Sequence, residues 1–302
     1  MGGRARLMRD TARSISAQFR KILFATDFSP ASLRALPYVK FVARRYDSTV
    51  YLVHVIGPQP AIAIPAGIRR GERADSLRGA EEQLRALEGS EELRGISHKR
   101  LVGEGKVAKL LLKAVREHNI GLIIVGTHGR TGIKHLVLGS VAEEIFRSSS
   151  CPVLTVGAHV ASPGPVSRIL LPTDLSTTSR CGLPFAVSLA ADAGAELVAL
   201  HVLPQSIASN PEAGVLTEPL REEVQSVLAG ALPAGVRSQA VLAYGDTAET
   251  IVSEAEKLKA QFIVLGIRSS FTSHRLSNVA YRVAISAGCP VLTVRDPAKN
   301  KG

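Results

Sequence analysis

A group of glycines, with one serine and one arginine, stands where the sequence changes from a strand pattern to a helix pattern. Gly126, Gly129 and Gly139 follow an apolar run, and Ser140 opens a stretch in which apolar residues have helical spacing. Glycine lets the backbone approach a ligand closely, and the amides of a helix's first turn point toward an anion. Arg130 adds a cation inside the loop. This combination predicts a binding site for phosphate groups.

An ordinary turn followed by a capped helix is the alternative reading of the same residues. Ser140 and Glu143 form the Ser-x-x-Glu pattern of a capping box, in which the serine hydroxyl bonds the Glu143 amide and is less free for phosphate. Glu143 and Glu144 also complement the helix dipole by themselves and weaken anion binding. The residues alone leave both interpretations open.

Short apolar runs alternate with amphipathic helices on either side of this loop. Strands are expected at 22–25, 49–55, 97–102, 121–125 and 153–156, and helices at 76–93 and 107–118. Ser29-Pro30 predicts a helix start, Pro37 predicts a kink in that helix, and residues 57–74 read as a long loop. The alternation predicts a parallel sheet with helices on both faces, in which ligands bind outside the carboxyl ends of the strands.

The chain then repeats itself after a Pro/Gly/Ser-rich linker. The strand at Ile22 returns at Ile169, an offset of 147 residues, and Cys151-Pro152 returns as Cys289-Pro290, an offset of 138. Self-similarity of this kind indicates a duplicated domain. We therefore expect a basic N-terminal extension (1–21), a first domain (22–157), a linker (158–167), a second domain (168–296) and a tail (297–302).

The second copy has lost the glycines of the loop. Gly266 matches Gly126, but Ser269, Ser277 and Asn278 stand where the first copy has Gly129, Gly139 and Ser140. Side chains then occupy the space that phosphates need. We predict one nucleotide site per chain, in the first copy, and a second copy kept for structure or partner contact. Weak anion binding through Arg268, His274 or Arg275 stays open.

Gly126-x-x-Gly129, nine further residues and Gly139-Ser140 resemble the ATP-binding signature of the universal stress protein family. The stretches 22–29, 52–55 and 151–156 resemble the family's first, second and last strands, and the likeness extends over 22–294 because the pattern occurs twice. The resemblance implies an α/β fold of two tandem, doubly wound, parallel five-stranded sheets, similar to adenine nucleotide alpha hydrolases and Rossmann-like domains.

The resemblance also implies a ligand and a set of contacts. ATP, with Mg²⁺ as an accompanying ion, is expected at Ala25, Thr26, Asp27, Val55, Val125, Gly126, Gly129, Gly139, Ser140 and Val141, with Arg130 and His128 as auxiliary cations. Val55 and Val125 offer apolar surface to the base. Asp27 accepts from ribose or base, or reaches the Mg²⁺ ion.

Partners follow from the same resemblance. Family members pair through their last strands, so Val153–Val156 and Val291–Val294 are expected to pair within the chain. Because an unpaired apolar edge strand invites further pairing, we also expect a homodimer. The expected activity is that of a nucleotide-responsive stress regulator that does not hydrolyse ATP, or does so slowly, and that acts on a regulatory protein not identified by the sequence.

The amino-acid composition limits the partners and the cellular compartment that we expect for this protein. The 302 residues carry a net charge of +11, of which the first 21 contribute +5. A basic protein can bind nucleic acid through its phosphates, but a solvated extension is favoured for the leader. Three cysteines at no metal-like spacing predict free thiols in a reducing compartment. No apolar run approaches the ~20 residues that span a bilayer, so we expect a cytoplasmic protein with no membrane partner.

Catalysis has less support in the sequence. There is no Gly-x-x-x-x-Gly-Lys-Ser/Thr motif, Ser140 has no neighbouring His base, and no His or Cys stands at metal-ligand spacing from His54 or His201. Both histidines are expected to be packed and hydrogen-bonded. An ATP-hydrolysing enzyme remains the rival reading, which predicts phosphate release that Asp27→Ala abolishes.

Overall fold

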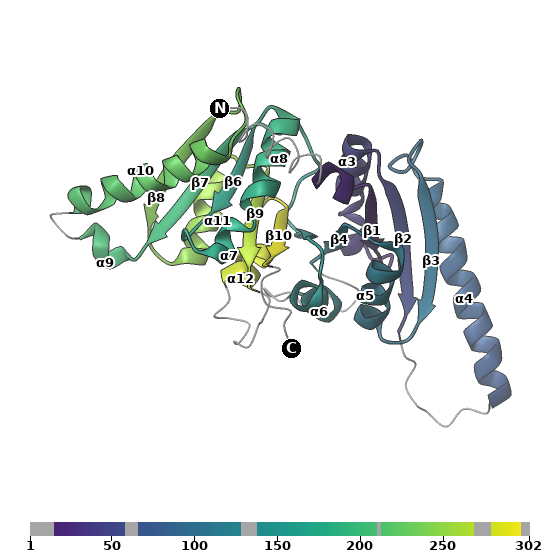
Figure 1. The fold of residues 1–302 in the computed structure, drawn as a ribbon. Coiled ribbons are helices and arrows are strands. Elements are labelled where there is room, and N and C mark those ends of the chain that lie inside the picture. The colour runs from purple at the N-terminus through teal and green to yellow at the C-terminus, as the bar shows by residue number, and fades with distance from the viewer. Residues whose placement is uncertain (1–14, 58–65, 128–137, 210–212, 269–278, 297–302) are drawn as a thin grey trace.

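A single ten-stranded sheet runs through the whole molecule in the computed structural model, which describes residues 15–57, 66–127, 138–209, 213–268 and 279–296. Figure 1 shows the two halves of the chain side by side, each with its own part of the sheet and its own helices. The strand order is β3-β2-β1-β4-β5-β10-β9-β6-β7-β8, so each half contributes five strands in the same order, mirrored about the joint between β5 and β10.

The first half alternates strands and helices as the sequence predicts. Its strands are β1 (Lys21–Ala25), β2 (Thr49–Ile56), β3 (His98–Glu104), β4 (Leu122–Gly126) and β5 (Val153–Val156). Its helices are α2 (Pro30–Leu33), α3 (Leu36–Tyr46), α4 (Ala66–Glu88), α5 (Val107–His118) and α6 (Ser140–Ser148). All strand pairs within this half are parallel.

The second half repeats this arrangement. Its strands are β6 (Arg168–Pro172), β7 (Glu196–Leu203), β8 (Ser238–Tyr244), β9 (Phe262–Ile267) and β10 (Val291–Arg295). Its helices are α7 (Thr177–Arg180), α8 (Leu183–Ala193), α9 (Gln205–Ala208), α10 (Ala213–Ala231), α11 (Thr247–Lys257) and α12 (Val279–Ser286). The duplication inferred from the sequence is thus present in the fold.

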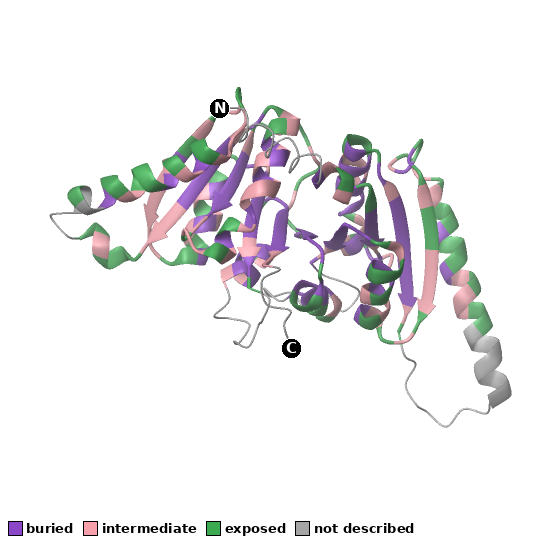
Figure 2. Cartoon of the chain, viewed as in Figure 1, coloured by how far each residue is buried: buried purple, intermediate pink, exposed green. Residues whose placement is uncertain are grey.

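Helices cover both faces of the sheet. One core cluster packs α3, α4, α8 and α10 against one face, and a second packs α5, α6, α11 and α12 against the other. Buried strands lie between helices that are exposed on their outer sides (Figure 2). Alternate residues of a strand point to opposite faces, so Leu23 belongs to one cluster while Ile22 and Phe24 belong to the other.

Three local expectations need correction. Pro37 does not kink a helix, because the chain forms two helices there and Pro37 lies in the first turn of α3, where a missing amide costs no hydrogen bond. Helix α4 begins at Ala66, inside the stretch 57–74 that reads as a loop. Ile15 and Phe19 are 4% and 1% exposed, so this end of the expected N-terminal extension is packed rather than solvated.

The joint between the halves is an antiparallel pairing of β5 with β10. Val291, Leu292 and Thr293 lie opposite Thr155, Leu154 and Val153, which confirms the expected pairing of the two last strands within one chain. The two five-stranded sheets are therefore parts of one continuous sheet, and every other strand pair among the described residues is parallel.

Aromatic contacts reinforce the joint on one face of the sheet. Phe19 packs on Phe185 with ring centroids 5.9 Å apart, and Tyr38 and Phe41 both contact Phe262, at 6.0 Å and 5.9 Å.

Among the described residues, no helix is long and apolar enough to cross a lipid bilayer.

Candidate functional site

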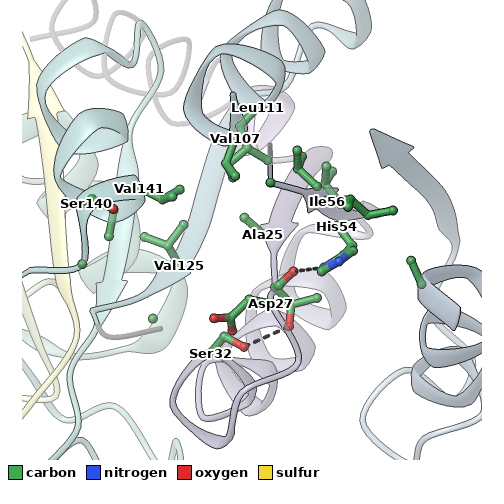
Figure 3. Close-up of a pocket in the computed structure, with 18 of the residues that line it drawn as sticks. Ala25, Asp27, Ser32, His54, Ile56, Val107, Leu111, Val125, Ser140 and Val141 are labelled. Carbon is green, nitrogen blue, oxygen red and sulfur yellow. Dashed lines mark hydrogen bonds between the residues drawn. The ribbon is translucent and has the colours of Figure 1, made fainter. Parts of the chain in front are cut away.

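A pocket of about 670 Å³ lies at the carboxyl ends of β1, β2 and β4 in the first half. It contains nine of the residues expected to contact a ligand: Ala25, Thr26, Asp27, Val55, Val125, Gly126, Gly139, Ser140 and Val141. Figure 3 shows Val125, Ser140 and Val141 on one side of the pocket and His54 and Ile56 on the other. Gly129, Arg130 and His128 lie outside the described residues, so their place relative to the pocket is not part of the structure.

The far wall of the pocket comes from residues that the sequence did not single out. Helix α4 contributes Ser76, Gly79, Ala80 and Gln83, and α5 contributes Val107 and Leu111. The apolar stripe of α5 is visible in the sequence, but its exposure to a cavity is not. Gly79 in the middle of a charged helix is a signal that could have been used, because an interior helical glycine usually has a packing or functional reason.

The start of α6 forms the polar end of the pocket. Gly139 is the N-cap, with φ −54° and ψ 145°, and Ser140 is the first helical residue. The Gly139 amide donates to the Thr127 carbonyl at 2.8 Å, and the Glu143 amide donates to the Gly139 carbonyl at 2.8 Å. The expected capping box is therefore wrong: a serine caps Glu143 only from the N-cap position, which Gly139 occupies. The Ser140 side chain is exposed at the pocket instead.

Thr26 has a structural role in a tight turn after β1. Its Oγ1 accepts from the Phe28 amide at 2.9 Å and lies 3.0 Å from the Ser32 hydroxyl. The turn places Phe28 at φ +62°. The Thr26 side chain is thus committed to the turn.

The second half builds the same turn with Thr173. Its Oγ1 accepts from the Leu175 amide at 3.1 Å and lies 3.1 Å from the Ser179 hydroxyl, and Leu175 has φ +61°. Because this turn persists in a half that lacks the loop glycines, its threonine is explained by backbone structure.

Asp27 also stabilises this turn. Its Oδ1 accepts from the Ser29 amide at 3.0 Å and from the Ser29 hydroxyl at 2.6 Å. In the second half Asp174 accepts from the Ser176 amide at 3.0 Å. Burial alone would raise the pKa of Asp174, but hydrogen bonds from Ser176 and Ser179 outweigh it and hold that pKa below its ordinary value. One carboxylate oxygen in each half is therefore engaged in the turn.

Gly126 is required by packing of the protein on itself. A Cβ atom on Gly126 would lie 2.7 Å from the Ala31 carbonyl oxygen in α2. At Gly266, the matching residue, a Cβ atom would lie 2.0 Å from the Thr178 carbonyl oxygen in α7. Both contacts are impossible for a real Cβ, so this glycine lets a helix approach the strand end. Its survival in the second half therefore says nothing about ligand binding.

The floor of the pocket differs between the halves. Pro172 of β6 occupies the position that Ala25 occupies in β1, because the two residues have equivalent partners on the neighbouring strand, β7 or β2. Leu265 of β9 occupies the position of Val125 in β4. Both replacements are larger and both are buried, Leu265 with 5% of its surface exposed.

The N-cap residues of the matching helices α5 and α11 have opposite charges. The N-cap of α5 is Lys106, which makes no side-chain cap, whereas the N-cap of α11 is Asp246, whose Oδ1 accepts from the amides of Ala248 and Glu249. Arg282 of α12 donates to the Asp246 Oδ2 at 2.9 Å. The first half therefore presents a cation and uncapped amides where the second half has a carboxylate already paired with an arginine.

His54 is packed as expected. Its Nδ1 lies 2.8 Å from the Thr26 carbonyl oxygen, the residue is 8% exposed, and the ring packs against Phe28 at a tilt of 34° with centroids 4.6 Å apart. His201 differs, because its buried Nδ1 has no hydrogen-bond partner among the described residues. No group of three or more His, Cys, Asp or Glu side chains in the described part of the chain could hold a metal ion.

Comparison with known proteins finds the same family in both halves. The model of the "Universal stress protein family" matches residues 18–157 and again residues 165–295. A universal stress protein of Methanocaldococcus jannaschii is 30% identical over 139 residues, which cover 46% of this chain and 82% of that protein. One from Mycolicibacterium smegmatis is 29% identical over 292 residues, covering 91% of this chain and 96% of that protein.

A solved structure shows the same fold over nearly the full length. The universal stress protein from Archaeoglobus fulgidus superposes with a TM-score of 0.71 and covers 91% of this chain and 98% of its own, at 22% identity. The tandem arrangement of the two halves therefore occurs in a protein whose sequence is otherwise quite different.

Proposed function

The chain belongs to the universal stress protein family, and on that premise we propose that its first half binds one adenine nucleotide, ATP, and that the protein acts as a nucleotide-responsive stress regulator. The single observation that carries the proposal is the pocket of about 670 Å³ at the carboxyl ends of β1, β2 and β4, which joins an apolar chamber to the start of α6. Its volume lies in the range of roughly 300–1,000 Å³ that small-molecule sites occupy.

The apolar chamber suits the base. Ala25, Val55 and Val125 line it from the sheet, and Val107 and Leu111 line it from α5. Flat aromatic rings gain free energy by leaving water for such a surface. Backbone groups at the ends of β1 and β2 can supply the few directed hydrogen bonds that fix its orientation.

The start of α6 suits the phosphates. Helix α6 has nine residues, and its first-turn amides have no intrahelical acceptor. The Ser140 hydroxyl stands among them, exposed at the pocket. Amides, hydroxyl and helix dipole together favour a negative group at this point. The loop residues Gly129 and Arg130 belong to the proposal through the sequence motif alone.

Mg²⁺ fits the same residues. It binds through one or two carboxylates together with nucleotide phosphates and retains several waters, so the Asp27 carboxylate and the phosphates would hold it between them. Bound there, the ion would neutralise phosphate charge. Asp27 would in addition fix the position of the ion through its anchored turn, because Ser29 already holds the Oδ1 atom.

Binding of one nucleotide per chain follows from the differences between the halves. Three residues that both halves share, Thr26/Thr173, Asp27/Asp174 and Gly126/Gly266, are explained by turn formation or packing. Two positions on the sheet that line the pocket are replaced in the second half, with Pro172 for Ala25 and Leu265 for Val125. The second half is then a structural and partner-binding unit.

Isothermal titration of the full chain with ATP tests the proposal. We expect one ATP bound per chain, a stoichiometry that stays the same with and without Mg²⁺, and tighter binding with Mg²⁺. Absence of binding, or two equivalent sites per chain, would contradict it. Mass spectrometry of the nucleotide that copurifies with the protein identifies the natural adenylate.

The remaining parts of the proposal concern what the bound state does. We propose that hydrolysis is absent or slow, which a multiple-turnover phosphate-release assay with Asp27→Ala as the comparison decides. Domain bounds of 22–157 and 168–296, a cytoplasmic location, a homodimer and a regulatory protein partner belong to the same proposal. The homodimer needs a surface other than β5 or β10, because these two strands pair with each other.

A further inference from the structure

Helix α6 is held at both ends by the second half of the chain. Tyr281 of α12 contacts Leu138, the residue before the N-cap of α6, and Arg295 at the end of β10 contacts the last turn of the helix. In Figure 1, α6 lies on the side of the first half that faces α12. The helix whose start lines the pocket is therefore part of the boundary between the halves.

The Tyr281 contact lies next to the polar end of the pocket. The Leu138 amide donates to the Tyr281 hydroxyl at 3.0 Å, and both residues are buried, with 1% and 5% of their surface exposed. The next amide, that of Gly139, donates to Thr127 in the first half. Two consecutive amides thus fix the backbone as it enters α6, one through each half of the molecule.

Arg295 satisfies the other end of α6. Its Nη2 donates to the Phe146 carbonyl at 2.8 Å and its Nε donates to the Ser149 carbonyl at 2.9 Å. The last carbonyls of a helix have no intrahelical donor, and a cation there also complements the helix dipole. The Nη1 atom donates to the Arg268 carbonyl at 3.1 Å, which ties the same guanidinium to the segment after β9.

Neither residue has a chemical equivalent in the first half. At the offset of 138 residues, Tyr281 corresponds to Glu143 and Arg295 corresponds to Gly157. The fold is duplicated, but these two contacts are not, and both are directed from the second half to the first. Both contacts therefore support α6, the helix that lines the pocket with its first residues and also contacts the second half.

We propose that Tyr281 and Arg295 are positioning residues for the nucleotide site of the first half. This inference rests on the proposed function. Tyr281 holds the backbone that places the Gly139 and Ser140 amides, and Arg295 anchors the opposite end of the helix. Donors that are fixed before binding need no ordering when the anion arrives, so the second half raises affinity for phosphate without touching the ligand.

Tyr281→Phe tests the proposal, because it removes one oxygen atom and leaves the Leu138 amide without its acceptor. Tyr38→Phe is the matched control. The Tyr38 hydroxyl also lies at the boundary between the halves, but it donates to the Ala161 carbonyl at 2.8 Å and not to α6. Binding of ATP and of adenosine to the full-length chain and to both variants is measured by titration calorimetry.

We expect Tyr281→Phe to weaken ATP binding about tenfold, the effect of ~1.4 kcal/mol, which is within the range for an unpaired buried amide. Adenosine affinity should change less than about twofold, since adenosine carries no phosphate. Tyr38→Phe should leave both affinities unchanged. Equal losses for ATP and adenosine, equal losses in both variants, or no loss would overturn the inference.

Hydrogen exchange of the nucleotide-free protein gives a readout that does not depend on binding. Tyr281→Phe should speed exchange at residues 138–142, and Arg295→Gln should speed it at 146–149, while Tyr38→Phe should do neither. If the unmodified chain binds no ATP, the proposed function fails and this inference fails with it. If the unmodified chain binds ATP but Tyr281→Phe and Arg295→Gln bind it equally well, the inference alone is refuted.

Discussion

Thr155 and Thr293 each donate a hydrogen bond to the strand of the other across the joint between the two halves. The Thr155 hydroxyl donates to the Val291 carbonyl at 3.2 Å, and the Thr293 hydroxyl donates to the Val153 carbonyl at 3.2 Å. The two threonines are equivalent at the offset of 138 residues, and both are buried. The duplicated strand thus uses the same side chain twice to connect the halves.

Thr155→Val and Thr293→Val should each lower the free energy of unfolding by about 1 kcal/mol, because each removes a buried hydrogen bond at nearly constant shape. Urea denaturation with an unchanged m-value is the measurement. Thr49→Val is the control, since the Thr49 hydroxyl has one contact of 3.4 Å to Ser97 in an exposed setting. Losses no greater than that of the control would show that these bonds do not stabilise the joint.

Gly79→Phe should fill the pocket from the α4 side. A Cβ atom on Gly79 meets nothing within 4 Å, although the residue lines the pocket. Replacing an interior helical glycine removes a penalty of roughly 0.5–1 kcal/mol, so the fold should not suffer. ATP affinity should fall about tenfold or more because the ring competes for the same space.

Gly230→Phe is the matched control for this substitution. Gly230 lies in α10, its Cβ would likewise meet nothing within 4 Å, and it is remote from the pocket lining. Calorimetric titration of both variants, together with thermal unfolding, separates the two effects. Unchanged ATP binding in Gly79→Phe would place the nucleotide elsewhere.

The contact between Asp246 and Arg282 should make stability depend on pH in the acid range. The Arg282 hydrogen bond, with the Glu249 amide, holds the pKa of Asp246 below its usual value. A depressed folded-state pKa contributes stability that is present above the unfolded value of ~3.9 and is lost as pH falls through the folded value. The side chain is 45% exposed, so solvent screening keeps the contribution below about 1 kcal/mol.

Asp246→Asn isolates that contribution, because asparagine retains the N-cap but has no charge to titrate. The difference in unfolding free energy between the unmodified chain and the variant should be largest near neutral pH and shrink below about pH 4. Denaturation curves from pH 2.5 to pH 7 measure it. A difference that stays constant across this range would mean that the carboxylate charge contributes nothing.

The three cysteines should differ in reactivity in the folded protein. All are free thiols, as expected from the sequence, and Cys151 and Cys289 pack as small hydrophobic residues with 8% and 9% exposure. Burial, with Glu256 nearby, raises the pKa of Cys289 to about 12, and burial also raises the pKa of Cys151. Thiolate is the reactive form, so both should resist alkylation at neutral pH.

Iodoacetamide labelling followed by mass spectrometry checks this order. Cys181, which is partly exposed, should react first, and its rate should be modest because burial and Asp296 raise its pKa as well. All three should react together in urea. Fast labelling of Cys289 in the native protein would show that the region around β10 opens easily.

Most of the fold can be predicted from local patterns in the sequence. The bounds of α5 and β5 are as expected, and Ser29 caps α2 through the Ser32 amide with Pro30 at the first helical position. These features depend on neighbours in the chain, such as apolar periodicity and cap residues, and so do not require tertiary contacts. The errors fall where two local interpretations compete, as at Pro37, which can interrupt a helix or begin one.

The internal repeat reveals more about the site than the motif does by itself. In sequence, Gly126 looks like a ligand-approach glycine and Thr26 looks like a ligand contact. Comparing the halves shows that both have structural tasks, because Gly266 and Thr173 perform the same tasks in the half where Pro172 and Leu265 replace Ala25 and Val125. These two shared positions serve the turn and its packing, and this distinction needs coordinates.

The sequence by itself determined the duplicated α/β fold, because strand periodicity and repeat offsets are written along the chain. The resemblance of its motifs to one family supplied the pairing of the last strands and nine of the residues that line one pocket. Only the tertiary structure decided that Gly139 rather than Ser140 caps α6, that α4 closes the pocket, and that Tyr281 and Arg295 hold α6 from the other half. These contacts join residues up to 149 positions apart, and no local pattern specifies which distant side chain will reach a given backbone group.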